Sequence, residues 1–275
     1  MQEKQQNKKS TAALSDYERR RKKVQRFNLT SDLFFGKVME DGLACQELIR
    51  ILTGERGLIV RKSKSQYSLR NLETHSIVLD VLAEAENQKL IGIEIHLEED
   101  EDHLRRSRFN LGCIDVNFLE KGSPYKEIPD VYMIYITEKD FLEGNRGIYR
   151  VEKTACEVRK IVEDGVCEFY VNLSVEPDDA DQASLLHFIR QSDSHYQTSV
   201  FPHLAAKVTQ MKEEKENVEI MCKIMEEERA EGRAEGEERL EKLCLNLIKD
   251  NRERDLRTAL NNRDYRNQLY QYYGV

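Results

Sequence analysis

The spacing of apolar residues along the chain predicts a domain that mixes helices with strands. Residues 29–53 carry apolar side chains three and four positions apart, which is typical of a half-buried helix, and Gly54 stands where such a helix ends. Gly36 and Gly42 interrupt the pattern, so the stretch predicts either one helix or two short ones. Residues 104–119 predict a further helix, and residues 58–72 predict a first strand followed by a polar loop. Apolar or β-branched runs predict further strands at residues 131–136, 149–151 and 168–173. This order of elements indicates a mixed α/β domain.

Residues 75–97 predict a β-hairpin that brings two acids together. Two apolar runs flank the polar segment 83–89, and a turn centred on Asn87 would place Asp80 directly opposite Glu94. Opposed like charges destabilise a strand pair, and a divalent cation between two carboxylates removes the repulsion. The alternative is a hairpin with one exposed face on which both acids are solvated. A slip of one residue reverses the faces, so the sequence alone leaves both interpretations open.

Two neighbours of Glu94 extend the metal-site hypothesis. The backbone carbonyl of Ile95 is placed to add a third oxygen ligand, and His96 follows Glu94 by two residues, which puts it on the same face of a strand. An imidazole there can orient water or phosphate or act as a general base, and the alternative is an ordinary interfacial histidine. Phosphodiester hydrolysis needs a metal that polarises the phosphate, an activated water and a stabilised leaving oxygen. The hairpin therefore carries groups that this reaction requires.

The sequence becomes almost continuously helix-forming after Pro202. Residues 229–236 read RAEGRAEG, and glycines in a helix cost about 1 kcal/mol each, so we expect a solvated helix or linker there. We expect a basic flexible arm at residues 1–27, a folded domain at 28–204, a long charged helix at 205–248 and a small helical tail at 249–275. Self-association through the long helix would make the protein a homo-oligomer.

Composition narrows the class of protein. The 275 residues carry a net charge of −8, but residues 1–28 hold nine Lys and Arg against three acids, which indicates either a solvated tail or an arm that contacts phosphates. The six cysteines form no CxxC pair, which argues against a zinc knuckle and fits reduced thiols in a cytoplasmic protein. No stretch is long and apolar enough to cross a bilayer, so we expect no membrane partner.

The order and spacing of these motifs resemble the PD-(D/E)XK nuclease superfamily. Within it, the chain is similar to the Rpn-type recombination-promoting nucleases, which are also called PD-(D/E)XK family transposases. The resemblance covers about residues 28–155 and rests on the segments at 30–38, 78–81, 93–96, 103–109, 121–125 and 131–136. The Glu- and Gly-rich helical repeat is also similar to tails in that family.

The resemblance implies a restriction-endonuclease-like mixed β-sheet flanked by helices and followed by a long C-terminal helical extension. It makes Asp80 and Glu94 ligands of Mg²⁺, with Mn²⁺ as the alternative ion. His96 stands where the superfamily has Lys and this family usually has Gln. Superfamily members often add an acid from the first helix, for which Glu47 is the candidate, and its alternative role is that of an exposed helix acid.

The implied activity is a metal-dependent DNA endonuclease associated with recombination or mobile elements. Arg106 and Arg108 match basic positions of the family and, with their neighbour Arg105, are the candidates for contacts to DNA phosphates. Their alternative role is ion pairing with the acids at residues 98–102. The alternative function is a nuclease-fold module that has lost its activity and binds DNA or a protein partner.

Overall fold

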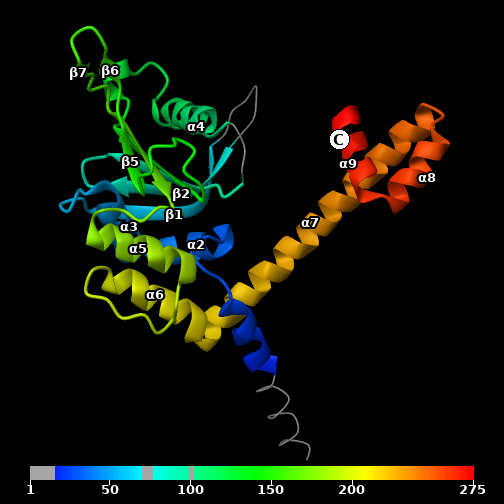
Figure 1. Ribbon diagram of the computed structural model, residues 1–275, viewed down its shortest axis with the longest axis horizontal. Coiled ribbons are helices and arrows are strands. Elements are labelled where there is room, and N and C mark those ends of the chain that lie inside the picture. Colours follow the sequence, from blue (N-terminus) through cyan, green and yellow to red (C-terminus); the bar gives the residue numbers. More distant parts are fainter. Residues whose placement is uncertain (1–15, 70–76, 99–101) are drawn as a thin grey trace, which may run out of the picture. The chain divides into compact units, whose positions relative to one another are not determined.

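The computed structural model describes residues 16–69, 77–98 and 102–275 (Figure 1). The chain divides into two compact units, one that ends at Val218 and one that comprises Glu219–Val275. The first unit contains a mixed sheet flanked by helices, and the long helix α7 (Lys215–Lys249) leads from it into the second. The expected fold class is confirmed.

Within the described residues, the main sheet has six strands in the order β1-β2-β3-β4-β8-β5. β1 to β3 are antiparallel neighbours, β3, β4 and β8 are parallel, and β5 is antiparallel to β8. The strand bounds are β1 (Val60–Leu69), β2 (Ile77–Ala85), β3 (Leu90–Ile95), β4 (Val131–Thr137), β5 (Ile148–Val151) and β8 (Val166–Asn172). A short hairpin of β6 (Thr154–Ala155) and β7 (Lys160–Ile161) lies apart from this sheet.

The central strand β4 is buried on both faces of the sheet. All seven of its residues are buried, as a continuous apolar run in a parallel sheet covered on both faces requires. Figure 1 shows α4 (His103–Phe118) on one side of the sheet and α2, α3, α5 and α6 on the other. Apolar residues of α4, among them Ile114, pack against β4 in one core cluster.

The stretch at residues 29–53, predicted to be one helix or two short ones, forms two helices, α2 (Asp32–Met39) and α3 (Gly42–Thr53). The second begins at Asp41, whose carboxylate accepts hydrogen bonds from the backbone N–H groups of Leu43 and Ala44. It ends at Gly54, which adopts the left-handed conformation (φ 76°) that favours glycine. The remaining elements of the first unit are the 3₁₀ turn η1 (Tyr125–Glu127), α5 (Ala180–Gln191) and α6 (Pro202–Glu213).

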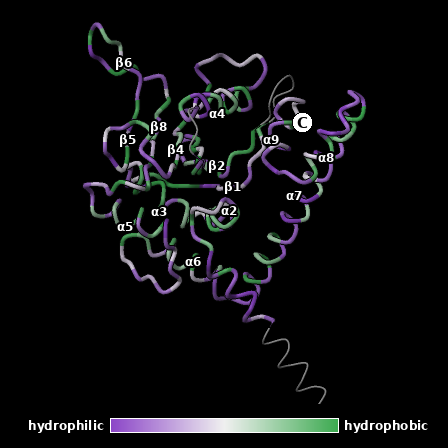
Figure 2. The backbone as a smooth tube through the Cα atoms, turned by 45° about the vertical axis from the view of Figure 1, so that its right-hand side comes forward, coloured by the Kyte–Doolittle hydropathy of each residue, from purple (hydrophilic) through white to green (hydrophobic). Residues whose placement is uncertain are grey.

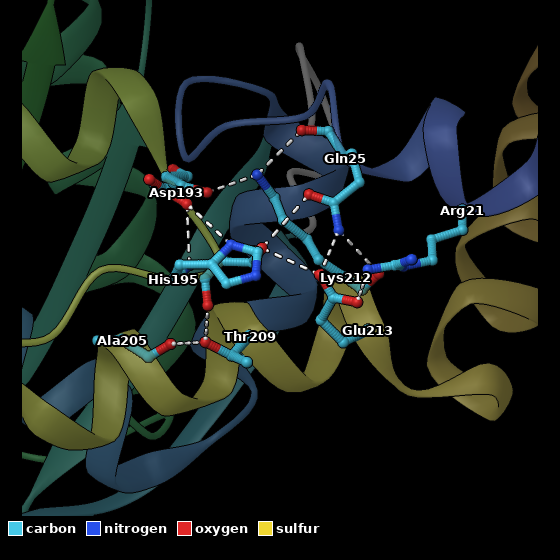
Figure 3. A network of polar contacts seen from close by, with 10 residues as sticks. Arg21, Gln25, Asp193, His195, Ala205, Thr209, Lys212 and Glu213 are labelled. Carbon is cyan, nitrogen blue, oxygen red and sulfur yellow. Dashed lines mark hydrogen bonds and ion pairs between the residues drawn. The ribbon is translucent and has the colours of Figure 1, made fainter. Parts of the chain in front are cut away.

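The prediction of a flexible arm at residues 1–27 is wrong for its second half. Residues 1–15 lie outside the described part of the chain, but residues 16–24 form a helix that packs on the folded domain. Val24 is fully buried, and the Tyr17 hydroxyl donates to the backbone carbonyl of Glu213 at the end of α6. Figure 3 shows the polar network that joins this helix to α6. The prediction failed because the contacts come from a segment almost 200 residues away.

The second unit has a small core of its own. The end of α7 packs against α8 (Glu253–Asn261) and α9 (Arg263–Tyr273), and this core contains Leu243, Leu247, Ala259, Leu269 and Tyr270. All residues from 226 to 239 are exposed, as expected for the solvated RAEGRAEG segment. In the described part of the chain, no helix is both long and apolar enough to cross a membrane.

Candidate active site

The β2–β3 ladder has the register predicted from the turn at Asn87. Its paired residues run from Glu84 opposite Leu90 to Val81 opposite Ile93, which leaves Asp80 and Glu94 as the next pair beyond the last rung. Their carboxyl groups share a hydrogen bond. The two acids therefore point at a common place, as the metal-site hypothesis requires, and the interpretation with two independently solvated acids is wrong.

Hydrogen bonds from a backbone N–H group and from a neighbouring side chain hold the Asp80 carboxylate in place. The residue is 8% exposed, and its Oδ2 accepts a hydrogen bond of 2.8 Å from the backbone N–H of Ile95, in the place of a further ladder rung. Its carboxylate also hydrogen-bonds the side chain of Gln66 on β1. Gln66 has a positive φ of 47°, which is uncommon for a residue other than glycine and concentrates at functional sites. Burial raises the pKa of Asp80 against the lowering effect of these hydrogen bonds.

Glu94 lies on the side of β3 that faces α4. Its Oε1 accepts a hydrogen bond of 3.3 Å from the Nδ2 group of Asn110 on that helix. Burial and the nearby negative charge of Asp80 raise the pKa of Glu94, and the positive charge of Arg106 opposes this rise. Without a cation, the pair thus keeps one proton at neutral pH, which its two carboxyl groups share.

Asp32 is a third acid near this pair and was missed as a site residue from the sequence. It occupies the first turn of α2, and its negative charge raises the pKa values of both Asp80 and Glu94. Partial desolvation raises the pKa of Asp32 itself, and the nearby imidazole of His96 opposes that rise. Asp32 therefore lies near the carboxyl pair, and His96 lies near Asp32.

Glu47 does not have the place that we expected for it. Its two carboxylate oxygens accept hydrogen bonds from the backbone N–H groups of His203 (3.2 Å) and Leu204 (2.8 Å). These are unsatisfied donors of the first turn of α6, so Glu47 stabilises the start of a helix. An acid from the first helical region does reach the site, but it is Asp32 from α2.

His96 follows directly after β3 and belongs to a cluster of rings. Its backbone N–H donates to the carbonyl of Ile136 at the end of β4, and its ring centroid lies 5.5 Å from that of His103 and 6.3 Å from that of Tyr135. The Nδ1 atom of His103 is 3.4 Å from the Tyr135 hydroxyl. Both neighbours are buried, so His96 packs against a fixed support.

The three arginines of α4 are exposed and line two hollows of its surface. Arg105 and Arg106 line the hollow to which Glu94 and Asn110 also contribute, while Arg108 and Arg105 line the second, along the helix. Arg106 forms an exposed ion pair of 3.7 Å with Asp102, so the alternative role predicted for it is present. A surface pair of this kind is weak and does not exclude a contact to phosphate.

The donor set fits a small, hard divalent cation. In the described ranges no group of three or more His, Cys, Asp or Glu side chains is close enough to hold an ion alone, and a zinc-type cage is thus missing. Mg²⁺ is commonly bound through one or two carboxylates, with waters and substrate phosphates as the remaining ligands. Asp80 and Glu94 match this pattern, because their shared hydrogen bond and raised pKa values show a crowding of negative charge that a cation relieves.

Gln66 and Asn110 could not be identified as site residues from their types alone. Asn110 is four residues after Arg106, one helical turn further, which is the only sequence signal for it. Gln66 stands beside Asp80 because β1 pairs with β2, with Ser65 opposite Val81 and Tyr67 opposite Leu79.

Comparisons with known proteins bear on the site as a whole. Neither the curated proteins nor the solved structures gave a match. The family model of the PD-(D/E)XK nuclease family transposases matches residues 46–233, a range that includes Asp80, Glu94, His96 and the arginines of α4. Since this range covers more than half of the sequence, the chain belongs to the PD-(D/E)XK nuclease family of transposases.

Proposed function

We propose that this protein is a DNA endonuclease that depends on Mg²⁺, with Mn²⁺ as a substitute, and that acts in recombination or on mobile elements. Family membership supports a nuclease-type function. The single observation that carries the proposal is the hydrogen-bonded pair of Asp80 and Glu94 where the β2–β3 ladder ends.

Asp80 and Glu94 would hold the ion, and the carbonyl of Ile95 is the third candidate ligand. When bound, the metal supplies polarisation of the phosphate and of a water molecule. The Ile95 N–H group holds the Asp80 carboxylate in place, so the ligand is oriented before the ion arrives. Asp32 adds negative charge beside the pair and is the candidate for a contact to the ion through water.

The remaining residues would act on the substrate. His96 has the position of the superfamily lysine, and an imidazole supported by His103 can orient the attacking water or a phosphate oxygen. Arg105 and Arg106 line the same hollow as Glu94, where they can bind DNA phosphates next to the metal, and Arg108 extends this basic surface along α4.

Cleavage of supercoiled plasmid DNA tests the proposal. The purified full chain should nick or cut the plasmid with Mg²⁺ or Mn²⁺ and not with EDTA, and Asp80→Asn and Glu94→Gln should lose this activity. Glu47→Gln is the matched control, because it makes the same chemical change in an acid that only caps α6. The proposal fails if the wild-type protein cuts no DNA with either metal or if the two site variants cut as well as the control.

A further inference from the structure

The helix at residues 16–24 carries a basic stripe that the candidate active site does not use. Arg19, Lys22, Lys23 and Arg26 are spaced i, i+3, i+4 and i+7, so they share one side of the helix and of the turn that continues it. All four are exposed, whereas Val24 on the other side is fully buried. In Figure 2 the short helix next to the grey N-terminal trace is mostly purple, the colour of hydrophilic residues.

The opposite side of this helix is bound to the end of α6. Arg21 forms an ion pair with Glu213, and the Gln25 amide donates to the same carboxylate at 2.7 Å (Figure 3). The Nζ group of the buried Lys212 donates to the backbone carbonyls of Gln25 (3.2 Å) and Ser192 (2.5 Å). These contacts fix which side of the helix faces solvent, so the basic stripe is held in one orientation.

The charges of the basic stripe are largely uncompensated. Arg19 pairs with Asp16 at 2.5 Å, but in the described part of the chain Lys22, Lys23 and Arg26 form no ion pair. With Glu18, the four cations line one open hollow on the surface. A protein with a net charge of −8 that gathers unpaired cations on one fixed surface has a local attraction for polyanions.

We propose that the basic stripe is a second DNA-binding surface, which holds the sugar-phosphate backbone away from the cleavage site. The inference rests on the proposed function, which makes DNA the polyanion. From Arg19 to Arg26 the helix rises about 10 Å, at about 1.5 Å per residue. This length matches about three nucleotides of one strand, at about 3.4 Å each, so three or four cations can meet successive phosphates. Contacts to phosphates carry no sequence information, so we expect binding through the stripe to be independent of sequence.

Binding of a fluorescently labelled DNA duplex at several salt concentrations tests this inference. The full chain carries Glu94→Gln as a background, so that the readout is binding alone. In this background, Lys22→Gln, Lys23→Gln and Arg26→Gln are combined, and the matched control combines Arg254→Gln, Arg257→Gln and Arg263→Gln, three exposed cations of the second unit. We expect the stripe variant to bind at least about tenfold more weakly, with a salt dependence shallower by about 0.9 for each lost phosphate contact, or roughly 2.7 in total. The control variant should change little in either quantity.

An unchanged affinity of the stripe variant would overturn the inference, and so would an equal loss in the control, which would indicate a general effect of net charge. Stripe-dependent binding to vesicles containing phosphatidylserine, without binding to the duplex, would overturn it in favour of a membrane surface. Thermal unfolding of each variant shows whether the helix remains docked. Because cleavage is not the readout, a failure of the endonuclease proposal remains distinguishable from a failure of the basic stripe.

Discussion

Asp80 and Glu94 meet beyond the last rung of the β2–β3 ladder and share a hydrogen bond between their carboxyl groups. Two carboxyl groups can make this bond only if one of them keeps its proton, so the pair carries one negative charge fewer than two ionised acids. A bound cation replaces that proton, and proton release and metal binding are therefore coupled at this site.

The first prediction concerns the pH dependence of stability in EDTA. Burial raises the pKa of Glu94 to about 9, above its value in the unfolded chain. A raised carboxyl pKa gives stability that is fully present below the unfolded pKa, about 4.3, and that is lost as the pH rises through the folded value. Glu94→Gln stays neutral, so its free energy of unfolding relative to the wild type should rise between about pH 5 and pH 9. Chemical denaturation across this range measures the difference, and a constant difference would contradict the assignment.

Metal binding should stabilise the folded protein by mass action. At a metal concentration of one hundred times Kd the expected gain is about 2.7 kcal/mol, which raises the melting temperature by several degrees. Thermal unfolding with Mg²⁺, with Mn²⁺ and with EDTA measures the gain. Asp80→Asn should abolish it, because one of the two carboxylates is lost. A gain of equal size in this variant would place the metal elsewhere.

His96 should matter for the rate of cleavage more than for binding. His96→Ala is expected to lower the cleavage rate by about 10²- to 10⁴-fold if the imidazole transfers a proton or orients the attacking water. His96→Gln and His96→Lys restore a polar donor at this position and should retain more activity than alanine. Single-turnover cleavage, with duplex binding measured separately, tests this order. Equal rates for all three variants and the wild type would show that His96 only packs against His103.

Asp32 should tune the metal site through its charge. Asp32→Asn removes a negative charge near Asp80 and Glu94, and loss of such a neighbouring group typically weakens metal affinity by about 10- to 100-fold. Titration of Mn²⁺ at constant pH measures the affinity. If Asp32→Asn binds Mn²⁺ like the wild type, the acid of α2 has no part in the site.

Glu47 should affect stability and leave the metal site unchanged. Glu47→Ala removes the acceptor for two N–H groups at the start of α6, and loss of a helix cap costs about 1 kcal/mol. Denaturant unfolding should show this loss, while the stabilisation by Mn²⁺ stays as in the wild type. A loss of the metal response would return Glu47 to the list of candidate ligands.

The sequence predicts the central hairpin well because its signals are local. The two apolar runs and the polar turn between them locate the hairpin, and the observed register, with Val81 opposite Ile93, brings Asp80 to Glu94. The all-apolar run of β4 is likewise typical of a buried parallel strand. Such features depend on residues that are close together in the chain.

The sequence is a poor guide where distant segments decide the outcome. Asp32 and Glu47 are both acids on helices. The packing of α2 on β1 and β2 brings Asp32 to the site, whereas Glu47 on α3 lies elsewhere. The helix at residues 16–24 is rich in charge, and its order depends on contacts with Lys212 and Glu213. Neither contact has a signature in the local pattern of hydrophobic and polar residues.

The bond from the Ile95 N–H group to Asp80 comes from the main chain and not from a neighbouring side chain. Every amino acid except proline supplies the same donor, so residue 95 can vary within the limits of its packing without freeing the aspartate. The orientation of the Asp80 carboxylate therefore depends on the backbone conformation and not on the side chain at position 95. A related sequence that differs at this position, but keeps the hairpin register, would inherit the same arrangement.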